Sequence, residues 1–195
     1  ESPGESEIPN GNGNKRDLGM QTALFVARTI HNDLTLVNAS SWSWWTALTR
    51  ADYKDGLVYL DDGTNNGSQV TDYCKKDGFA RDSKLMWMLG NYSFFVRPGM
   101  KRVAVITENP DPEKESKDVM ISAYKDGSSK KIVLVAVNVG SVNRKYNLQD
   151  LKLKNQTLTP YTTSETSNLG KGTTIKTNEI VVPAKSVVTF VGELE

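Results

Sequence analysis

The feature that most constrains the fold is a change in the character of the chain at Arg97-Pro98-Gly99. A Pro-Gly pair ends a helix and begins a turn. All four tryptophans precede this point, whereas the residues after it have the pattern of short strands separated by turns. We therefore predict two parts: an α/β part over residues 1–99 and an antiparallel β-sandwich over residues 100–195.

Two amphipathic helices are predicted in the first part. Residues 1–16 are rich in Gly, Asn, Ser and Glu, show no periodicity and are predicted to form a loop. The first helix begins near Asp17, a good N-cap residue, and the second begins at Asp82 or Ser83. Each carries an apolar stripe with the spacing of one helix face. The stripes are Met20, Ala23, Leu24, Ala27 and Ile30 in the first helix, and Leu85, Met88, Leu89, Tyr92 and Phe95 in the second.

A short apolar run at residues 34–39 is typical of a strand that is buried on both faces. Residues 58–60 are predicted to form a second short strand. A strand buried on both faces needs a parallel neighbour on each side, because its backbone groups must otherwise stay unpaired. We therefore interpret residues 1–99 as the last units of a larger α/β structure.

Short strands at regular spacing are predicted after Gly99, with Asp126-Gly, Asn168-Leu-Gly and Pro183-Ala as turn signals between them. This spacing favours an antiparallel sandwich. The predicted strands are residues 103–107, 119–124, 131–139, 145–148, 157–161, 173–176, 179–182 and 186–191.

The aromatic segment, residues 38–45, follows the run at 34–39 and has the sequence Asn-Ala-Ser-Ser-Trp-Ser-Trp-Trp. Flat indole faces pack against the C–H faces of sugar rings, and in an α/β barrel the carboxyl ends of the strands carry the substrate. We predict sugar contacts for Ser41, Trp42 and Trp44. The alternative, that the tryptophans fill a core between the two parts, stays open for Trp44 and Trp45, and Trp45 is expected to be packed.

Several segments in order resemble one enzyme family, glycoside hydrolase family 30. Asp17-Leu-Gly-Met, the aromatic segment, and Asp52-Tyr-Lys-Asp-Gly-Leu-Val-Tyr resemble the family's last barrel units. Leu89-Gly-Asn-Tyr-Ser-Phe-Phe-Val-Arg-Pro-Gly-Met resembles its final barrel helix and the exit into the side domain. Val182-Pro-Ala-Lys-Ser-Val-Val-Thr-Phe-Val resembles its last strands.

This resemblance implies the C-terminal end of a TIM barrel followed by a β-sandwich, in a secreted or periplasmic retaining β-glycosidase. Such chemistry uses two glutamates about 5 Å apart, an acid/base and a nucleophile. In the family they follow the fourth and seventh strands, so the resemblance implies that both lie upstream of this chain. Ser6-Glu7 is similar to the family's nucleophile motif, which makes Glu7 the remaining candidate.

The resemblance also bears on substrates and partners. Substrates in the family include β-1,6-galactan, β-1,6-glucan, xylan and glucosylceramide, and the aromatic segment resembles the galactanase-like members. No metal or organic cofactor is implied. The expected partners are a polysaccharide or oligosaccharide and either the missing barrel segment or a second copy of the chain, because the predicted helix–strand–helix region leaves apolar faces uncovered.

Composition excludes other functions. The formal net charge is +1 with basic residues spread along the chain, which argues against nucleic-acid binding. No apolar run reaches the roughly 18 residues of a membrane span. The first seven residues are not a signal peptide, so we expect any leader to lie upstream. Cys74 is the single cysteine, and the spacing of Asp52, Asp55, Asp61 and Asp62 fits no EF-hand loop. A structural role is favoured for His31.

The rival interpretation is a non-catalytic carbohydrate-binding module or a structural β-sandwich module. A binding module would present aromatic side chains on one sandwich face. After residue 99 the aromatic residues are Tyr124, Tyr146, Tyr161 and Phe190, without a tryptophan. The sequence therefore favours the enzyme.

Overall fold

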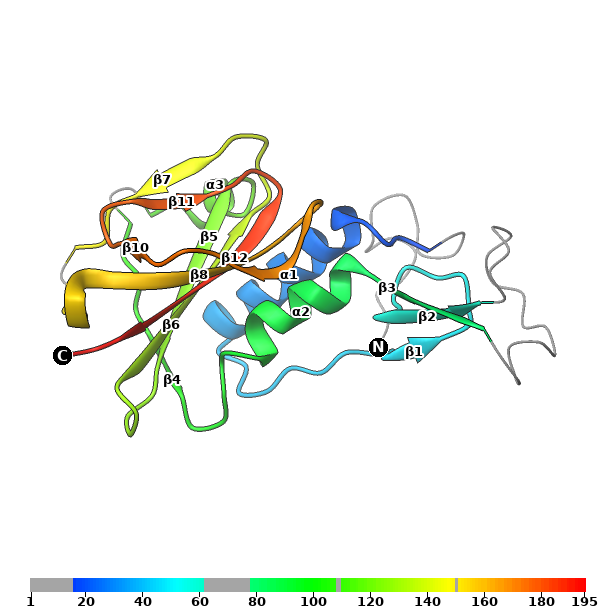
Figure 1. Cartoon of the computed structure of the whole chain (residues 1–195), viewed down its shortest axis with the longest axis horizontal. Coiled ribbons are helices and arrows are strands. Elements are labelled where there is room, and N and C mark those ends of the chain that lie inside the picture. Colours follow the sequence, from blue (N-terminus) through cyan, green and yellow to red (C-terminus); the bar gives the residue numbers. More distant parts are fainter. Residues whose placement is uncertain (1–15, 62–77, 108–109, 150) are drawn as a thin grey trace.

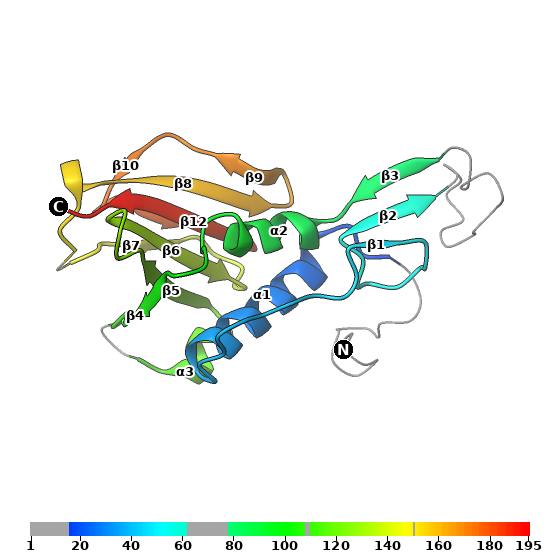
Figure 2. The ribbon, with the colours of Figure 1, turned by 90° about the horizontal axis from the view of Figure 1, so that it is seen from below.

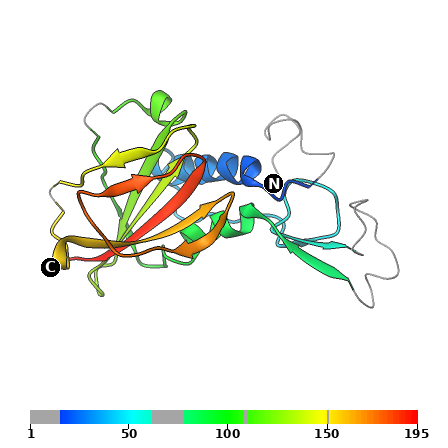
Figure 3. The same cartoon turned by 45° about the horizontal axis from the view of Figure 1, so that its top comes forward.

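The computed structural model describes residues 16–61, 78–107, 110–149 and 151–195. These residues form a sheet-rich structure with few helices, in which a seven-stranded sheet carries two helices on one face (Figure 1). A two-stranded sheet lies over the other face, as seen best in Figure 3. A separate three-stranded sheet lies at the far end of the helices.

Both predicted helices are present. Helix α1 spans Met20–Thr35 and helix α2 spans Lys84–Ser93. The carboxylate of Asp17 accepts hydrogen bonds from the amides of Gly19 and Thr22, so it serves the helix start although α1 begins three residues later. Ser83 is the N-cap of α2, as predicted, and its side chain accepts from the amide of Met86.

The strand predicted at residues 34–39 is wrong. Leu34 and Thr35 form the last turn of α1, and Leu36 and Val37 are 61% and 71% exposed. The amides of Leu36 and Ala39 donate to carbonyl oxygens in the last turn of α1, so the chain leaves the helix in a hydrogen-bonded turn. An apolar run of this length fits the end of a helix as well as a strand, because periodicity cannot separate the two over so few residues.

The large sheet is antiparallel, with the strand order β10-β8-β12-β6-β5-β4 and with β9 paired to β8. Strand β12 lies at its centre and pairs with β6 from Ser186 opposite Asn138 to Glu193 opposite Lys131. The strands are β4 (Lys101–Val103), β5 (Val119–Lys125), β6 (Lys131–Asn138), β8 (Thr157–Ser164), β9 (Ser167–Lys171), β10 (Ile175–Lys176) and β12 (Ser186–Glu193).

The smaller elements complete the fold. Strands β7 (Arg144–Tyr146) and β11 (Ile180–Val182) pair antiparallel. In the three-stranded sheet, β1 (Leu48–Thr49) is parallel to β2 (Val58–Asp61), which is antiparallel to β3 (Phe79–Asp82). The short helix α3 covers Pro112–Glu115, and the 3₁₀ turn η2 covers Lys154–Gln156.

Seven of the eight strands predicted after Gly99 are present within a few residues, and one is largely wrong. Strand β4 ends at Val103, and Ile106, which was expected in a strand, is 88% exposed. The predicted turn at Asn168-Leu-Gly lies inside β9, where Leu169 has a positive φ of 52° and the pairing with β8 is irregular. The predicted turn residues therefore do bend the backbone, but they lie within an irregular strand that pairs with β8.

Two hydrophobic clusters lie on the two faces of the seven-stranded sheet. Along β6, Val133, Val135 and Val137 belong to the cluster beneath α1 and α2, and Ile132 and Leu134 belong to the cluster beneath β7 and β11. This alternation follows from the two-residue period of a strand. Figure 2 shows α1 and α2 side by side on their face of the sheet.

The first cluster includes both helix stripes, from Met20 in α1 to Phe95 just after α2, together with side chains of β5, β6 and β12. It is reinforced by Asn91, which is fully buried and donates from Nδ2 to the hydroxyl of Thr189 at 3.0 Å. The sheet therefore covers the two helix stripes. The division at residue 99 stays a prediction, since one core joins residues on both sides of it.

Candidate functional site

The aromatic segment runs from the end of α1 toward β1, and its side chains alternate in exposure. Trp42 and Trp44 are half-buried and pack against the first cluster, whereas Ser41 and Ser43 are exposed. Trp45 is 70% exposed, so the expectation that it is packed is wrong. The segment therefore presents one open indole beside two partly covered ones.

The two half-buried indoles form an ordered pair. The rings of Trp42 and Trp44 are stacked, with centroids 5.7 Å apart and an interplanar angle of 10°. Each ring nitrogen donates a hydrogen bond: Trp42 Nε1 to Asp33 Oδ2 at 2.9 Å, and Trp44 Nε1 to the carbonyl of Asp55 at 2.7 Å. Both rings are thus fixed in the free protein, which reduces the entropy that a ligand must remove on binding.

The turn that includes Asp55, the hydrogen-bond partner of Trp44, is held by the buried hydroxyl of Tyr59. The hydroxyl of Tyr59 donates to the carbonyl of Tyr53 at 2.6 Å and accepts from the amide of Gly56 at 3.0 Å. Burial raises the pKa of Tyr59 above its usual value. A Cβ on Gly56 would lie 2.6 Å from the Tyr59 ring, so only glycine fits there.

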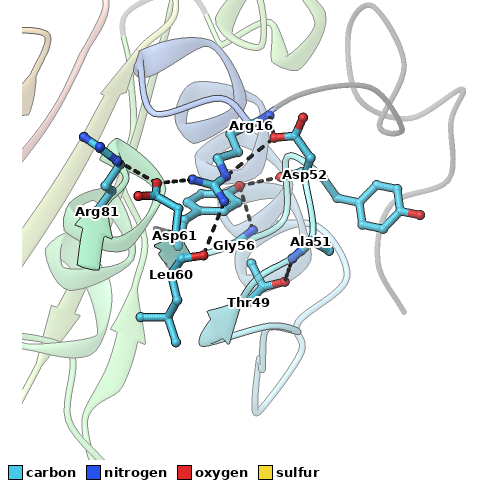
Figure 4. Close-up of polar contacts among 10 residues, drawn as sticks. Arg16, Thr49, Ala51, Asp52, Gly56, Leu60, Asp61 and Arg81 are labelled. Atoms are coloured by element: carbon cyan, nitrogen blue, oxygen red, sulfur yellow. Dashed lines mark hydrogen bonds and ion pairs between the residues drawn. The ribbon is translucent and has the colours of Figure 1, made fainter. Parts of the chain in front are cut away.

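A charge cluster lies next to this turn (Figure 4). Arg16 Nη1 and Arg81 Nε donate to the same oxygen of Asp61, at 2.6 Å and 2.7 Å. The central carbon of the Arg16 guanidinium lies 5.0 Å from the centroid of the Tyr59 ring. The backbone amide of Arg16 donates to the carboxylate of Asp52. The side chains of Arg16 and Asp61 are 9% and 5% exposed. The carboxylates of Asp52 and Asp61 both face arginine side chains. Their arrangement is therefore structural and ties the start of α1 to β2 and β3.

His31 is 8% exposed and lines a cavity of about 140 Å³ together with Arg102, Glu115 and Ser122. Burial, with a smaller contribution from the Arg102 charge, lowers the pKa of His31 to about 4. The imidazole is therefore neutral at pH 7. Its Nδ1 atom makes no hydrogen bond within the described residues. This environment is that of a structural side chain in a core interface.

Glu7, Asp62 and Cys74 lie outside the described residues. Within the described ranges, no three His, Cys, Asp or Glu side chains gather so that they could hold a metal ion. In the same part of the chain, every helix is too short or too polar to cross a membrane.

Sequence reasoning missed the residues that support the tryptophans. Asp33 and Asp55 lie nine and eleven positions from their indole partners, on different elements, and no motif links them. Asp55 accepts through its backbone carbonyl, which any residue type supplies, so its identity carried no signal.

The family model of O-glycosyl hydrolase family 30 matches residues 4–59. The chain itself is 31% identical to glucuronoxylanase XynC from Bacillus subtilis and 32% identical to the enzyme of that name from strain 168. Both alignments extend over 193 residues, 96% of the chain. The chain covers 38% of the length of either relative.

Two solved structures are also similar to this chain. A conserved exported protein from Bacteroides fragilis is 36% identical, with a TM-score of 0.76 over 88% of this chain and 33% of its own. The catalytic domain of xylanase C of family 30 from Talaromyces cellulolyticus is 19% identical, with a TM-score of 0.69 over 92% of this chain and 38% of its own. At that identity the second likeness concerns the fold alone.

Proposed function

Because the chain belongs to glycoside hydrolase family 30, we propose that it is the C-terminal part of a retaining β-glycosidase that acts on a xylan-type polysaccharide. The longer protein of which this chain forms a part is the parent enzyme. The observation that carries the proposal is the alignment of 96% of the chain with two glucuronoxylanases. The substrate class follows their names rather than the galactanase-like resemblance of the aromatic segment.

In this proposal α1, α2 and the β1–β2 pair are the last units of a TIM barrel, and the seven-stranded sheet with β7 and β11 is the attached sandwich. The parallel pairing of β1 with β2 supports the barrel part, since barrel strands are parallel. Exposed apolar side chains, Leu36, Val37, Leu48 and Phe79 among them, offer surface for the rest of the barrel or for a second copy.

The aromatic segment is the proposed contribution of this chain to the active site. Ser41, Trp42 and Trp44 keep their predicted sugar contacts, and Trp45 joins them because its indole is mostly exposed. An indole face and the C–H face of a pyranose exclude water from each other, and the ring quadrupole attracts those hydrogens. The two glutamates that perform the double displacement belong to the upstream part of the parent enzyme. No cofactor takes part.

The proposed location is outside the cytoplasm, secreted or periplasmic. The support is that the Bacteroides fragilis relative is an exported protein. A polysaccharide is too large to cross a cell membrane, so an enzyme that cleaves it must meet it outside the cell.

An activity assay tests the proposal. The parent enzyme is expected to release reducing sugar from glucuronoxylan, and more slowly, if at all, from β-1,6-galactan and β-1,6-glucan. The 195-residue chain alone is expected to release none from any of the three, because neither catalytic glutamate is available to it. A parent enzyme that prefers β-1,6-galactan would contradict the assigned substrate class.

A Glu7→Gln variant of the chain is the control for the isolated-chain assay. If the chain alone shows turnover that disappears in this variant, Glu7 is a nucleophile and the upstream placement of the catalytic pair is wrong. Turnover that persists unchanged in the variant points to a contaminating glycosidase, which purification to constant specific activity removes.

A further inference from the structure

The turn that leads into the aromatic segment is held by the last turn of α1. The amides of Leu36 and Val37 both donate to the carbonyl of Asn32, at 2.8 Å and 3.2 Å. The amide of Ala39 donates to the carbonyl of Asp33 at 2.9 Å. Consequently the backbone that delivers Trp42 begins from a fixed point on the helix.

Asp33 also holds the Trp42 side chain. Its Oδ2 atom accepts the hydrogen bond of Trp42 Nε1 at 2.9 Å, so one residue fixes both the backbone at Ala39 and the ring three residues later. An indole has a single N–H donor, and a carboxylate is a stronger acceptor than a neutral oxygen. The hydrogen bond to Asp33 is therefore the one that orients this ring.

The ring orientation in turn determines the stack. The ring centroids of Trp42 and Trp44 lie 5.7 Å apart with the two planes 10° apart, and the Trp44 ring nitrogen donates to the carbonyl of Asp55. If Trp42 turns about its side-chain bonds, the near-parallel arrangement is lost. A sugar ring needs a flat, correctly inclined partner, so the loss of orientation weakens stacking without removing any aromatic atom.

We propose that Asp33 is a positioning residue for sugar binding: its carboxylate holds Trp42 against Trp44 and so presents the indole pair to the polysaccharide. This inference rests on the proposed function, in which Trp42 contacts the sugar. Asp33 itself does not touch substrate. The chain offers a matched comparison in Asp82, an exposed carboxylate that accepts from the indole nitrogen of Trp87.

The first test uses the chain itself and measures the indole pair. Two stacked indoles couple electronically and give paired bands of opposite sign in the circular dichroism spectrum. The paired bands are expected to disappear in Asp33→Ala. They should persist in Asp33→Asn, because the amide oxygen still accepts the hydrogen bond, and in the control Asp82→Ala. Alanine is a better helix former than aspartate, so α1 stays intact in the first variant. An unchanged pair of bands in Asp33→Ala would overturn the proposal.

The second test measures the Kd of catalytically inactivated parent enzyme for xylohexaose. Asp33→Ala is expected to weaken binding about tenfold, as for the loss of one orienting hydrogen bond. Asp33→Asn and Asp82→Ala should bind like the unsubstituted protein, a rescue that a merely structural role would not show. Thermal unfolding of each variant, measured in parallel, separates orientation from global stability.

Trp42→Ala separates the proposed sugar contact of Trp42 from the proposed positioning role of Asp33. If this variant binds xylohexaose normally, the sugar contact of Trp42 in the proposed function is wrong, and the role of Asp33 in sugar binding fails with it. If Trp42→Ala weakens binding but Asp33→Ala does not, only the positioning role of Asp33 is overturned.

Discussion

Asp61→Ala is expected to lower the free energy of unfolding by about 3–5 kcal/mol, the usual range when one partner of a buried ion pair is removed. Asp61 accepts from Arg16 at 2.6 Å and from Arg81 at 2.7 Å through a single oxygen. The Arg16 side chain is 9% exposed, so the substitution leaves a guanidinium with little water to replace its partner. The measurement is urea unfolding followed by circular dichroism.

The controls separate burial from charge. Asp118 forms an ion pair with Arg144 at 2.8 Å, but both side chains are more than a third exposed. Asp118→Ala should therefore cost less than about 1 kcal/mol. Asp61→Asn, which keeps an acceptor and loses the charge, should lie between the two. If Asp61→Ala costs no more than Asp118→Ala, the cluster does not tie α1 to β2 and β3.

The second large effect is a loss of stability in acid through His31. Its folded-state pKa is lowered to about 4, first by burial and then by the charge of Arg102, from an ordinary value of 6.5. A group with a depressed pKa binds its proton more readily in the unfolded chain. The contribution of neutral His31 to the free energy of unfolding is therefore complete above pH 6.5 and is lost as the pH falls toward 4. A difference of this size corresponds to about 3 kcal/mol.

His31→Gln tests this directly, because glutamine does not titrate. The free energy of unfolding of both proteins is measured from pH 7 to pH 4. The difference between them should shift by about 3 kcal/mol across this window in favour of the variant. A constant difference from pH 7 to pH 4 would mean that His31 is protonated as easily in the folded chain as in the unfolded one.

Local periodicity was enough to predict the helices. The stripe from Met20 to Ile30 is buried as expected, because residues three and four apart on a helix share a face regardless of what covers it. What covers the stripe was not predictable. The valines of β6 cover the stripe within the same chain. That the missing barrel segment or a second copy covers the remaining apolar surface stays a prediction.

The run at residues 34–39 shows why local pattern fails at element ends. Six mostly apolar residues fit a buried strand, but the choice depends on whether parallel partners exist, which is tertiary information. The chain instead continues α1 to Thr35 and turns, leaving Leu36 and Val37 exposed.

The sequence singled out the aromatic segment but not its geometry, and its contact with sugar stays a prediction. The density of tryptophans identified residues 38–45, and the structure finds the stacked pair there. The relative exposure of Trp42 and Trp45 was opposite to expectation, because it depends on which side of an extended segment meets the core. The partnership of Trp42 with Asp33 joins a loop to a helix and has no signature in the sequence.

The most direct test of the central claim, that the aromatic segment contacts the sugar in a family 30 glycosidase, is the kcat/KM of the parent enzyme on glucuronoxylan after Trp45→Ala. The indole is 70% exposed, so the substitution should change stability little. The expected loss is about tenfold to a hundredfold in kcat/KM, equivalent to about 1–3 kcal/mol of transition-state stabilisation. Trp87→Ala, which removes an indole outside the segment, should leave kcat/KM within about twofold. Equal kcat/KM values for Trp45→Ala and the unsubstituted enzyme would contradict the claim.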